Sequence, residues 1–289
     1  MLIDATTRVI VQGITGRQAS WSVADMLSYG TRIVAGVVPG RGGSSHSGLP
    51  VFNTVAEAAT ATGANASIVY VPAASAGEAV AEAIEARVPI VVYPGDLLPL
   101  HDTVRLRRAA IDAGVVFIGP NTPGLISPEQ AKLGFMPSFC YRRGRLGVIS
   151  RSGSLSYEIC WRLSSAGIGQ SCVVGVGGDV VKGMTIGEVL ELFSEDPETD
   201  AILVLGEVGG VEEYQAADYR GRTGAKPVVA FLVGQAAPHG RKLGHAGALI
   251  ASTREGYAAK VAVLQNSDIL VATSISGVVP LVREALRTQ

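Results

Sequence analysis

The sequence has few cysteines, almost no net charge and no long hydrophobic run, and each absence excludes a class of protein. Its three cysteines, Cys140, Cys160 and Cys172, are odd in number and form no C-x-x-C pair, which argues against a disulfide framework and against a zinc ribbon. A formal net charge of -1 gives no support for binding to nucleic acid or to a membrane surface. No apolar stretch approaches the ~20 residues that span a bilayer, and the first residues lack a signal-peptide core. We therefore expect a soluble, cytoplasmic protein that acts on a small molecule or with another protein.

What the sequence does contain is a regular alternation of short Val- and Ile-rich runs with Ala-rich segments. Such runs predict buried parallel strands with helices on both faces of the sheet. The 289 residues have room for two cores. We predict an α/β protein with a Rossmann-like domain at 1–125, a linker with prolines and basic residues at 126–145, and a flavodoxin-like domain at 146–289. The predicted strands are 8–14, 33–38, 67–71, 90–93 and 115–118 in the first domain and 146–149, 171–176, 201–206, 228–233 and 269–273 in the second.

A glycine turn follows the first predicted strand. The segment Gln12-Gly-Ile-Thr-Gly-Arg-Gln18 lets the backbone approach a phosphate while the next helix offers its positive end. Its spacing is not G-x-G-x-x-G, and glycine can also serve such a turn for steric reasons alone. The second strand runs into Pro39, Gly40 and Arg41, with a cation where an NAD enzyme usually has a carboxylate. A cation there suits the phosphorylated ribose of coenzyme A or NADP, although a solvated loop arginine is the commoner case.

Further loops end neighbouring predicted strands at the same edge of the sheet. They contain Pro72, the run Pro94-Gly95-Asp96, and Asn121. Prolines and glycines fix the loop shape and leave backbone groups to meet an adenine or a pantetheine amide. Asn121 is the side chain we expect to contact the ligand, with an Asx-type turn beside proline as the alternative.

His245 lies in a loop of small residues, 244–248, beyond the predicted strand 228–233. A neutral imidazole is a nucleophile, and this loop predicts one that accepts a phosphoryl group. A second loop, Ser152-Gly153-Ser154, runs from a strand into a helix, where free backbone amides make an anion site. Nucleophile and anion site together predict phosphoryl transfer.

Eight segments follow one another along the whole chain: Gln12-Gly-Ile-Thr-Gly-Arg-Gln18, Gly36-Val-Val-Pro-Gly-Arg-Gly-Gly43, Gly48-Leu-Pro-Val-Phe-Asn-Thr-Val55, Ile118-Gly-Pro-Asn121, Gly147-Val-Ile-Ser-Arg-Ser-Gly-Ser-Leu-Ser-Tyr-Glu158, Val176-Gly-Gly-Asp179, Gly206-Glu-Val-Gly-Gly210 and Gly244-His-Ala-Gly-Ala248. In this order they resemble the α subunit of succinyl-CoA synthetase, also called succinate–CoA ligase.

The resemblance implies a ligase that phosphorylates its acid to an acyl phosphate, which the thiol of coenzyme A then attacks. His245 would carry the phosphoryl group, Glu207 would fix the tautomer of its ring, and Tyr157 would contact the substrate or simply pack. Ser152, Gly153 and Ser154 would hold the phosphate. An obligatory β subunit with an ATP-grasp domain would bind ATP or GTP with Mg²⁺, in a heterodimer or a dimer of heterodimers. No histidine pair of this chain has the spacing of a metal site, so we expect no metal on it.

The resemblance also places coenzyme A on the first domain. Its contacts would be Thr15, Gly16, Arg17, Gln18, Arg41 in place of the family's lysine, and the loop Pro94, Gly95 and Asp96. That loop departs from the family, which commonly has Thr-Glu-Gly where this chain has Gly95-Asp96-Leu97.

Three other functions are weighed against succinate–CoA ligase. Malate–CoA ligase carries the same motifs but would need a polar partner for the extra hydroxyl. An NAD(P)-dependent oxidoreductase would account for the first domain alone and would leave His245 without a chemical role. A CoA-responsive scaffold would not need His245 and Glu207.

Overall fold

The computed structural model describes residues 2–238, 240 and 244–287, and the chain forms two compact units. The N-terminal unit consists of Ile3–Met136 together with the short segment Val181–Met184. The C-terminal unit joins Pro137–Val180 to the residues from Thr185 onward. The predicted α/β class is confirmed. The domain bounds stay a prediction, and the segment predicted as a linker contains strand β9, a short 3-10 helix and the start of strand β10.

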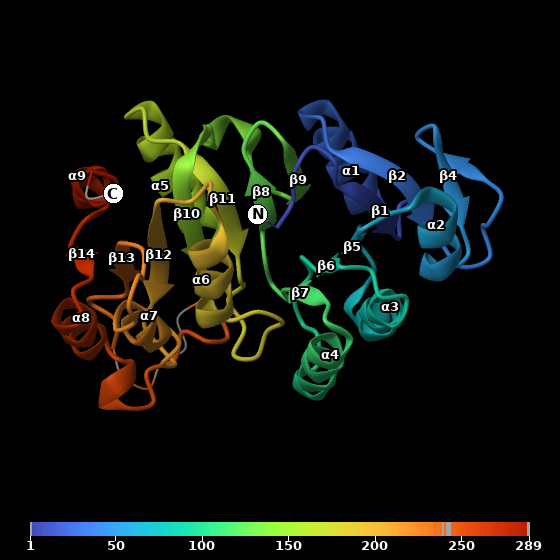
Figure 1. The fold of residues 1–289 in the computed structure, drawn as a ribbon. Coiled ribbons are helices and arrows are strands. Elements are labelled where there is room, and N and C mark those ends of the chain that lie inside the picture. Colours follow the sequence, from blue (N-terminus) through green and yellow to red (C-terminus); the bar gives the residue numbers. More distant parts are fainter. Residues whose placement is uncertain (1, 239, 241–243, 288–289) are drawn as a thin grey trace. The chain divides into compact units, whose positions relative to one another are not determined.

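The N-terminal unit is built on a sheet whose strands follow the order β3-β4-β2-β1-β5-β6-β7 (Figure 1). All neighbours are parallel except β3, which pairs antiparallel with β4 at the edge. The parallel strands have the Rossmann order, in which the chain changes direction beside the first strand. The strands are β1 (Arg8–Gln12), β2 (Arg32–Val37), β3 (Ser45–His46), β4 (Leu49–Phe52), β5 (Ala66–Val69), β6 (Ile90–Val92) and β7 (Val116–Ile118).

One face of this sheet packs against three helices, because their small apolar side chains share a core with the strands. Ala58, Val80 and Leu106, one from each helix, are buried there. Thr54 begins α2 with a capping box to Glu57, and glycines in the left-handed conformation end α1, α2 and α4. The helices are α1 (Arg17–Tyr29), α2 (Val55–Thr62), α3 (Ala73–Glu85) and α4 (Leu100–Ala113).

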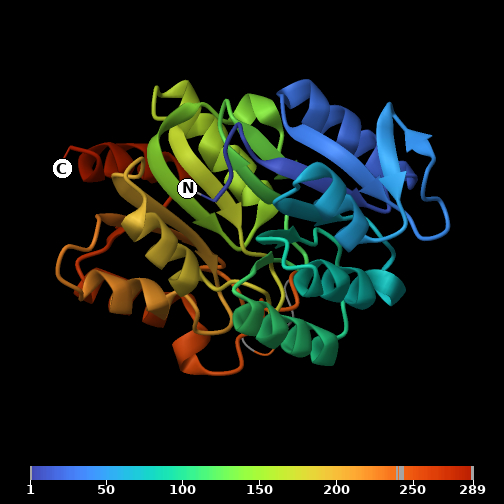
Figure 2. The ribbon, with the colours of Figure 1, turned by 45° about the vertical axis from the view of Figure 1, so that its right-hand side comes forward.

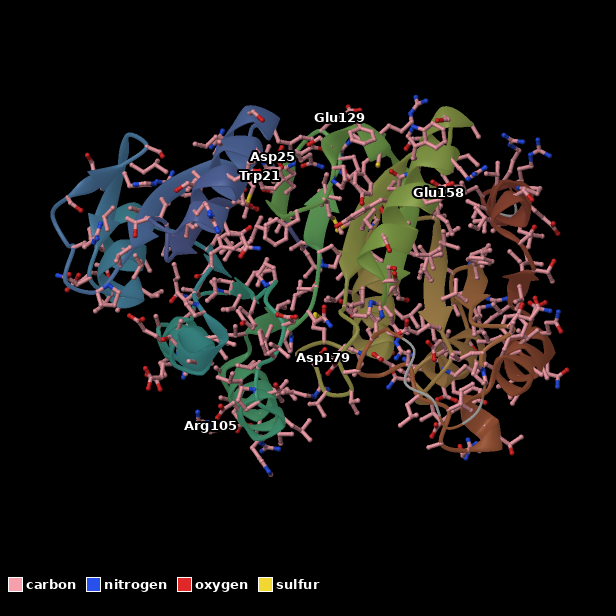
Figure 3. The ribbon with its side chains drawn as sticks, turned by 180° about the vertical axis from the view of Figure 1, so that it is seen from behind. Trp21, Asp25, Arg105, Glu129, Glu158 and Asp179 are labelled. Atoms are coloured by element: carbon pink, nitrogen blue, oxygen red, sulfur yellow. The ribbon has the colours of Figure 1, made fainter. Side chains whose placement is uncertain are left out.

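A hairpin of β8 (Gly124–Ser127) and β9 (Ala131–Gly134) follows the last strand and packs against α1. Lys132, fully buried in β9, pairs with Asp25 of α1 at 2.5 Å. Trp21 comes from the same helix as Asp25 (Figure 3), and its ring stacks on Phe135 with 6.4 Å between centroids. The periodicity of the sequence did not predict this hairpin.

The C-terminal unit has its own strands in the order β14-β13-β12-β10-β11, all parallel. This is the flavodoxin-like order, with the change of direction between β10 and β12. α5 and α9 pack on one face of the sheet and α6, α7 and α8 on the other (Figure 2). The elements are β10 (Arg143–Ser150), α5 (Gly153–Ser165), β11 (Gln170–Gly175), α6 (Ile186–Glu195), β12 (Ala201–Glu207), α7 (Tyr214–Arg220), β13 (Val228–Val233), α8 (Tyr257–Asn266), β14 (Leu270–Ala272) and α9 (Ile275–Ala285), with 3-10 turns at η1 (Ser138–Cys140) and η2 (Thr253–Glu255).

Candidate functional site

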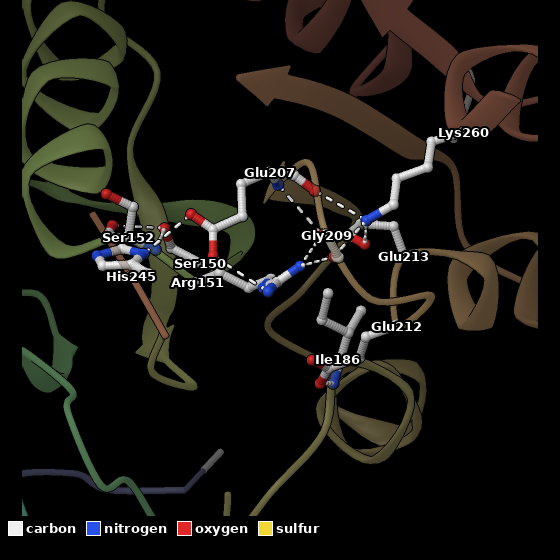
Figure 4. A network of polar contacts seen from close by, with 10 residues as sticks. All are labelled: Ser150, Arg151, Ser152, Ile186, Glu207, Gly209, Glu212, Glu213, His245 and Lys260. Carbon is white, nitrogen blue, oxygen red and sulfur yellow. Dashed lines mark hydrogen bonds and ion pairs between the residues drawn. The ribbon is translucent and has the colours of Figure 1, made fainter. Parts of the chain in front are cut away.

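The structure brings His245 and Glu207 together in the C-terminal unit (Figure 4). His245 lies in the loop between β13 and η2, and Glu207 is the last residue of β12. The ring nitrogen Nδ1 of His245 lies 2.9 Å from Oε2 of Glu207. An ionised carboxylate can only accept, so in the neutral ring Nδ1 carries the proton and Nε2 keeps its lone pair. The hydrogen bond to Glu207 raises the pKa of His245 above its ordinary value, and partial burial opposes that rise.

The ring of His245 is backed by the chain that follows β11. A Cβ at Gly178 would lie 2.6 Å from Cγ of His245, so only glycine lets the ring approach this backbone. The N–H of Gly247 donates to the carbonyl of Gly178 at 3.0 Å and holds the loop against it. Asp179, next in the chain, also raises the pKa of His245. About a third of the imidazole, 32% of its side-chain surface, stays exposed for a reacting group.

Ser152 lies between β10 and α5, and Gly153 and Ser154 are the first two residues of α5, so the three stand at a strand-to-helix junction as the sequence predicts. Ser152 is the N-cap, and its Oγ accepts from the N–H of Leu155 at 3.5 Å. This helix start lies at the carboxyl end of β10, the strand beside β12, where the sheet changes direction and open α/β sheets bind their ligands. Burial raises the pKa of Tyr157, one turn into α5, to about 12, so it stays a neutral hydroxyl at pH 7.

Three charged residues that sequence reasoning missed lie behind Glu207. Arg151 bridges two carboxylates, with Nη2 3.1 Å from Oε1 of Glu207 and Nη1 2.8 Å from Oε1 of Glu213. Lys260 of α8 pairs with the other oxygen of Glu213. Burial alone would raise the pKa of Glu213, but Arg151 and Lys260 lower it below its ordinary value. A lysine within the apolar run Ala258-Ala-Lys-Val-Ala262 was the available signal, because a buried cation needs a partner.

In the N-terminal unit, the glycine turn predicted after the first strand connects β1 to α1. Gly13 has a φ of 73°, and a Cβ there would lie 2.4 Å from the carbonyl oxygen of Tyr70. The turn therefore needs glycine to pass the neighbouring strand end. Thr15 is half-buried, and the start of the helix is exposed at Gly16, Arg17 and Gln18.

The other predicted loop residues also follow strand ends of this sheet. Asn121, with a φ of 55°, donates its N–H to the carbonyl of Gly95 at 2.7 Å and so joins the loops after β6 and β7. A Cβ at Gly95 would lie 2.4 Å from the hydroxyl of Tyr93, which explains glycine at the position where this chain departs from the family. Pro94 is buried. The exposed members of the set are Pro39, Arg41, Pro72 and Asp96.

Within the described ranges, no cluster of three or more His, Cys, Asp or Glu has the arrangement of a metal site. Among the helices that the structure describes, none is both long and apolar enough to cross a membrane.

Two protein families match successive parts of the chain. Residues 4–93 match the CoA binding domain family, and residues 149–270 match the CoA-ligase family. The first match lies in the N-terminal unit and contains the glycine turn. The second lies in the C-terminal unit and contains His245, Glu207 and the serine loop.

Curated relatives match nearly the whole chain. It is 47% identical over 286 residues, 99% of this chain and 98% of the relative, to succinate–CoA ligase [ADP-forming] subunit alpha 1 of Archaeoglobus fulgidus. It is 44% identical over 94% of its length, and 90% of the relative's, to the corresponding alpha subunit of Aquifex aeolicus.

Among solved structures, Methanosaeta concilii ATP citrate lyase with (3S)-citryl-CoA superposes with a TM-score of 0.89 at 25% identity. The match covers 100% of this chain and 51% of the lyase, so this chain spans about half the length of that protein. A dinucleotide-forming acetyl-coenzyme A synthetase of Ca. Korarchaeum cryptofilum, with a TM-score of 0.72 at 22% identity over 93% of this chain and 58% of the synthetase, shares the fold.

Proposed function

The chain belongs to the family of ADP-forming succinate–CoA ligase α subunits, and from this premise we propose that His245 is its phosphoryl carrier. The observation that carries the proposal is the 2.9 Å contact between Nδ1 of His245 and Oε2 of Glu207. It leaves Nε2 as the nucleophilic atom and places a negative charge beside the ring when the ring becomes cationic.

The proposed chemistry passes one phosphoryl group through His245. The lone pair of Nε2 attacks the γ-phosphorus of the nucleoside triphosphate, and the bond to the leaving diphosphate breaks. An oxygen of succinate then attacks the same phosphorus, the bond from Nε2 breaks, and succinyl phosphate forms. The thiolate of coenzyme A attacks the acyl carbon and phosphate leaves. Throughout, Glu207 holds the proton on Nδ1 and stabilises the imidazolium that forms when Nε2 is bonded to phosphorus.

We assign the holding of the phosphate to Ser152, Gly153 and Ser154. The first N–H groups of α5 have no partner within the helix, and the helix dipole adds about 0.3–1 kcal/mol for each negative charge at its N-terminus. Tyr157, a neutral hydroxyl at pH 7, is the proposed hydroxyl contact for the acid.

Coenzyme A belongs to the N-terminal unit, whose family is the CoA binding domain. We propose that Arg17 and Arg41, both exposed at strand ends of one sheet, meet its phosphates. Thr15, Gly16 and Gln18 offer backbone and side-chain donors from the turn after β1. Pro39, Pro72, Pro94, Gly95, Asp96 and Asn121 are the proposed walls of the binding site.

The α-subunit family implies a β partner. We propose that this β subunit carries an ATP-grasp domain with the nucleotide and Mg²⁺, and that the complex is a heterodimer or a dimer of heterodimers in the cytoplasm. ATP is the favoured nucleotide because the relatives are named ADP-forming. Malate and related dicarboxylates are the alternative acids, tested by comparing their rates with succinate.

The test is phosphorylation of the full chain, co-expressed with its β subunit, by γ-labelled ATP. We expect an acid-labile, base-stable label on this chain, linked to Nε2, and its complete loss in His245→Asn. His101→Asn is the matched control, because His101 is an exposed histidine of the N-terminal unit. A full label on the His245 variant, or none on the wild type, contradicts the proposal.

A further inference from the structure

Four charged side chains are buried together beneath His245 (Figure 4). Arg151 follows β10, Glu207 ends β12, Glu213 precedes α7 and Lys260 lies in α8. Their side chains are 3%, 7%, 0% and 0% exposed. The two positive and two negative charges of this network balance. Removing charges from water costs free energy, however, so such a network is by itself weak evidence that it stabilises the fold. Its place directly behind the nucleophile suggests a second role.

Arg151 and His245 divide the carboxylate of Glu207 between them. Nη2 of Arg151 lies 3.1 Å from Oε1 as an ion pair without hydrogen-bond geometry, and Nδ1 of His245 is hydrogen-bonded to Oε2 at 2.9 Å. Because the guanidinium is planar, its second nitrogen has a fixed direction. That nitrogen, Nη1, meets Oε1 of Glu213 at 2.8 Å and the carbonyl of Gly209 at 3.0 Å. The orientation of the Glu207 carboxylate is therefore tied to Glu213.

Glu213 and Lys260 fix the backbone of the same segment. Oε1 of Glu213 accepts the N–H of Glu207 at 3.1 Å. Nζ of Lys260 donates to the carbonyl of Glu207 at 2.8 Å and to that of Gly209 at 2.9 Å. Glu207 is thus held at its amide, its carbonyl and its carboxylate at once.

The backbone packs closely on two members of this network. A Cβ at Gly247 would lie 2.7 Å from Nη2 of Arg151, so the loop that carries His245 lies directly on the guanidinium. A Cβ at Gly206 would lie 2.7 Å from Cγ of Glu213. Glycines at both positions let the network and the loop meet.

We propose that Arg151, held in place by Glu213 and Lys260, is a positioning residue that turns Glu207 so that Oε2 faces Nδ1 of His245 and Nε2 is the nucleophile. Its relevance to turnover rests on the proposed function of His245. The charged groups that face the ring are Glu207, Arg151 and Asp179.

The test reads the tautomer of His245 directly. The full chain is labelled with ¹⁵N-histidine, and the His245 signals are assigned by their loss in His245→Gln among the 4 histidines. At a pH where the ring is neutral, the wild type is expected to hold the proton on Nδ1. In Arg151→Gln we expect a mixture of both tautomers and a loss of phosphorylation rate of about 10- to 100-fold, the range found for residues that orient metal-ligating histidines. Arg151→Lys keeps the charge without the planar fork and should restore only part of the rate.

Two further variants separate positioning from folding. The double variant Arg151→Gln/Glu213→Gln removes one cation and one anion, so the remaining buried charges still balance. It replaces Arg151→Gln in the test if that single variant fails to fold. Arg220→Gln is the control, because Arg220 is the arginine of an ion pair with Asp268 elsewhere in the same unit. An Nε2–H tautomer in the wild type overturns the proposal, as does an unchanged tautomer and rate in the folded Arg151 variants. A wild type without label on His245 contradicts the proposed function instead, whatever tautomer is measured.

Discussion

The two predicted sites use opposite physical means to handle negative charge. Around His245, charges are buried and each is paired, and we propose that Arg151, Glu213 and Lys260 together hold Glu207 in place. In the N-terminal unit, the proposed coenzyme A contacts are backbone amides and exposed cations such as Arg17 and Arg41. The first site needs a rigid interior to fix one atom. The second needs only a fitting shape and exposed charges that water and salt screen. Removing a charged side chain should therefore cost more free energy at the first site than at the second.

The largest expected effect is on stability, at Lys260. Lys260→Met removes one of the two cationic partners of the fully buried Glu213 and leaves Arg151 as the other, and breaking a buried pair on one side costs about 3–5 kcal/mol. Urea unfolding measures the change in the free energy of unfolding. The double variant Glu213→Gln/Lys260→Met removes both charges and should cost clearly less. Arg17→Gln, an exposed residue of the other unit, should stay within about 0.5 kcal/mol of the wild type. If Lys260→Met costs no more than Arg17→Gln, the proposed contrast between the two sites is wrong.

The next effect is on the pH dependence of phosphorylation. The folded-state pKa of His245 is raised above the ordinary 6.5, chiefly by the hydrogen bond to Glu207. The stability that this pairing adds is present below the unfolded pKa and is lost as pH rises through the folded pKa. Attack by Nε2 needs the neutral ring, so the rate should fall as pH drops through that raised pKa.

Glu207→Gln tests this assignment. Losing the carboxylate should move the acid limb of the rate profile to lower pH and slow phosphorylation by about 10- to 100-fold. Rapid-quench labelling across the pH range measures both. An acid limb that stays in place in the variant would show that another group titrates there.

How much of this could be predicted from the sequence differs between the two parts of the site. Glu207 ends β12 and His245 lies in the loop after β13, so the order of neighbouring parallel strands brings them to the same edge of one sheet, and their roles stay a prediction. Arg151, Glu213 and Lys260 come from three separate segments, and only side-chain packing decides that they meet. Lys260 lies in α8, a helix that the periodicity of the sequence did not predict. Its charged residue lies on the buried face of the helix, where the pattern of an amphipathic helix requires an apolar one. The β8–β9 hairpin was missed because the breaks in the strand pattern, at prolines and charged residues, favoured a linker.

A smaller effect is expected from crowding two glycines, one in each unit. Gly178→Ala would place a Cβ 2.6 Å from Cγ of His245, and Gly13→Ala would place one 2.4 Å from the carbonyl oxygen of Tyr70 at a φ of 73°. Overpacking of this kind costs about 1–3 kcal/mol in each case. Gly178→Ala should reduce phosphorylation and leave coenzyme A affinity unchanged, and Gly13→Ala the reverse. Labelling and calorimetric titration with coenzyme A measure the two readouts. Loss of both activities in either variant would show that the two sites are not independent.

The smallest effect is expected at Arg41. This side chain is exposed after β2, so its pairing with a phosphate of coenzyme A is screened by water and salt and is worth about 0.2–1 kcal/mol. Arg41→Gln should therefore raise the KM for coenzyme A by no more than about fivefold and leave phosphorylation of His245 unchanged. Arg41→Lys, the residue common in the family, should keep most of the affinity because a point charge suffices at an exposed site. Raising the salt concentration should reduce the difference between wild type and Arg41→Gln. A KM effect that persists at high salt would mean that Arg41 becomes buried against the ligand, and the N-terminal site would then resemble the buried one more than its free structure suggests.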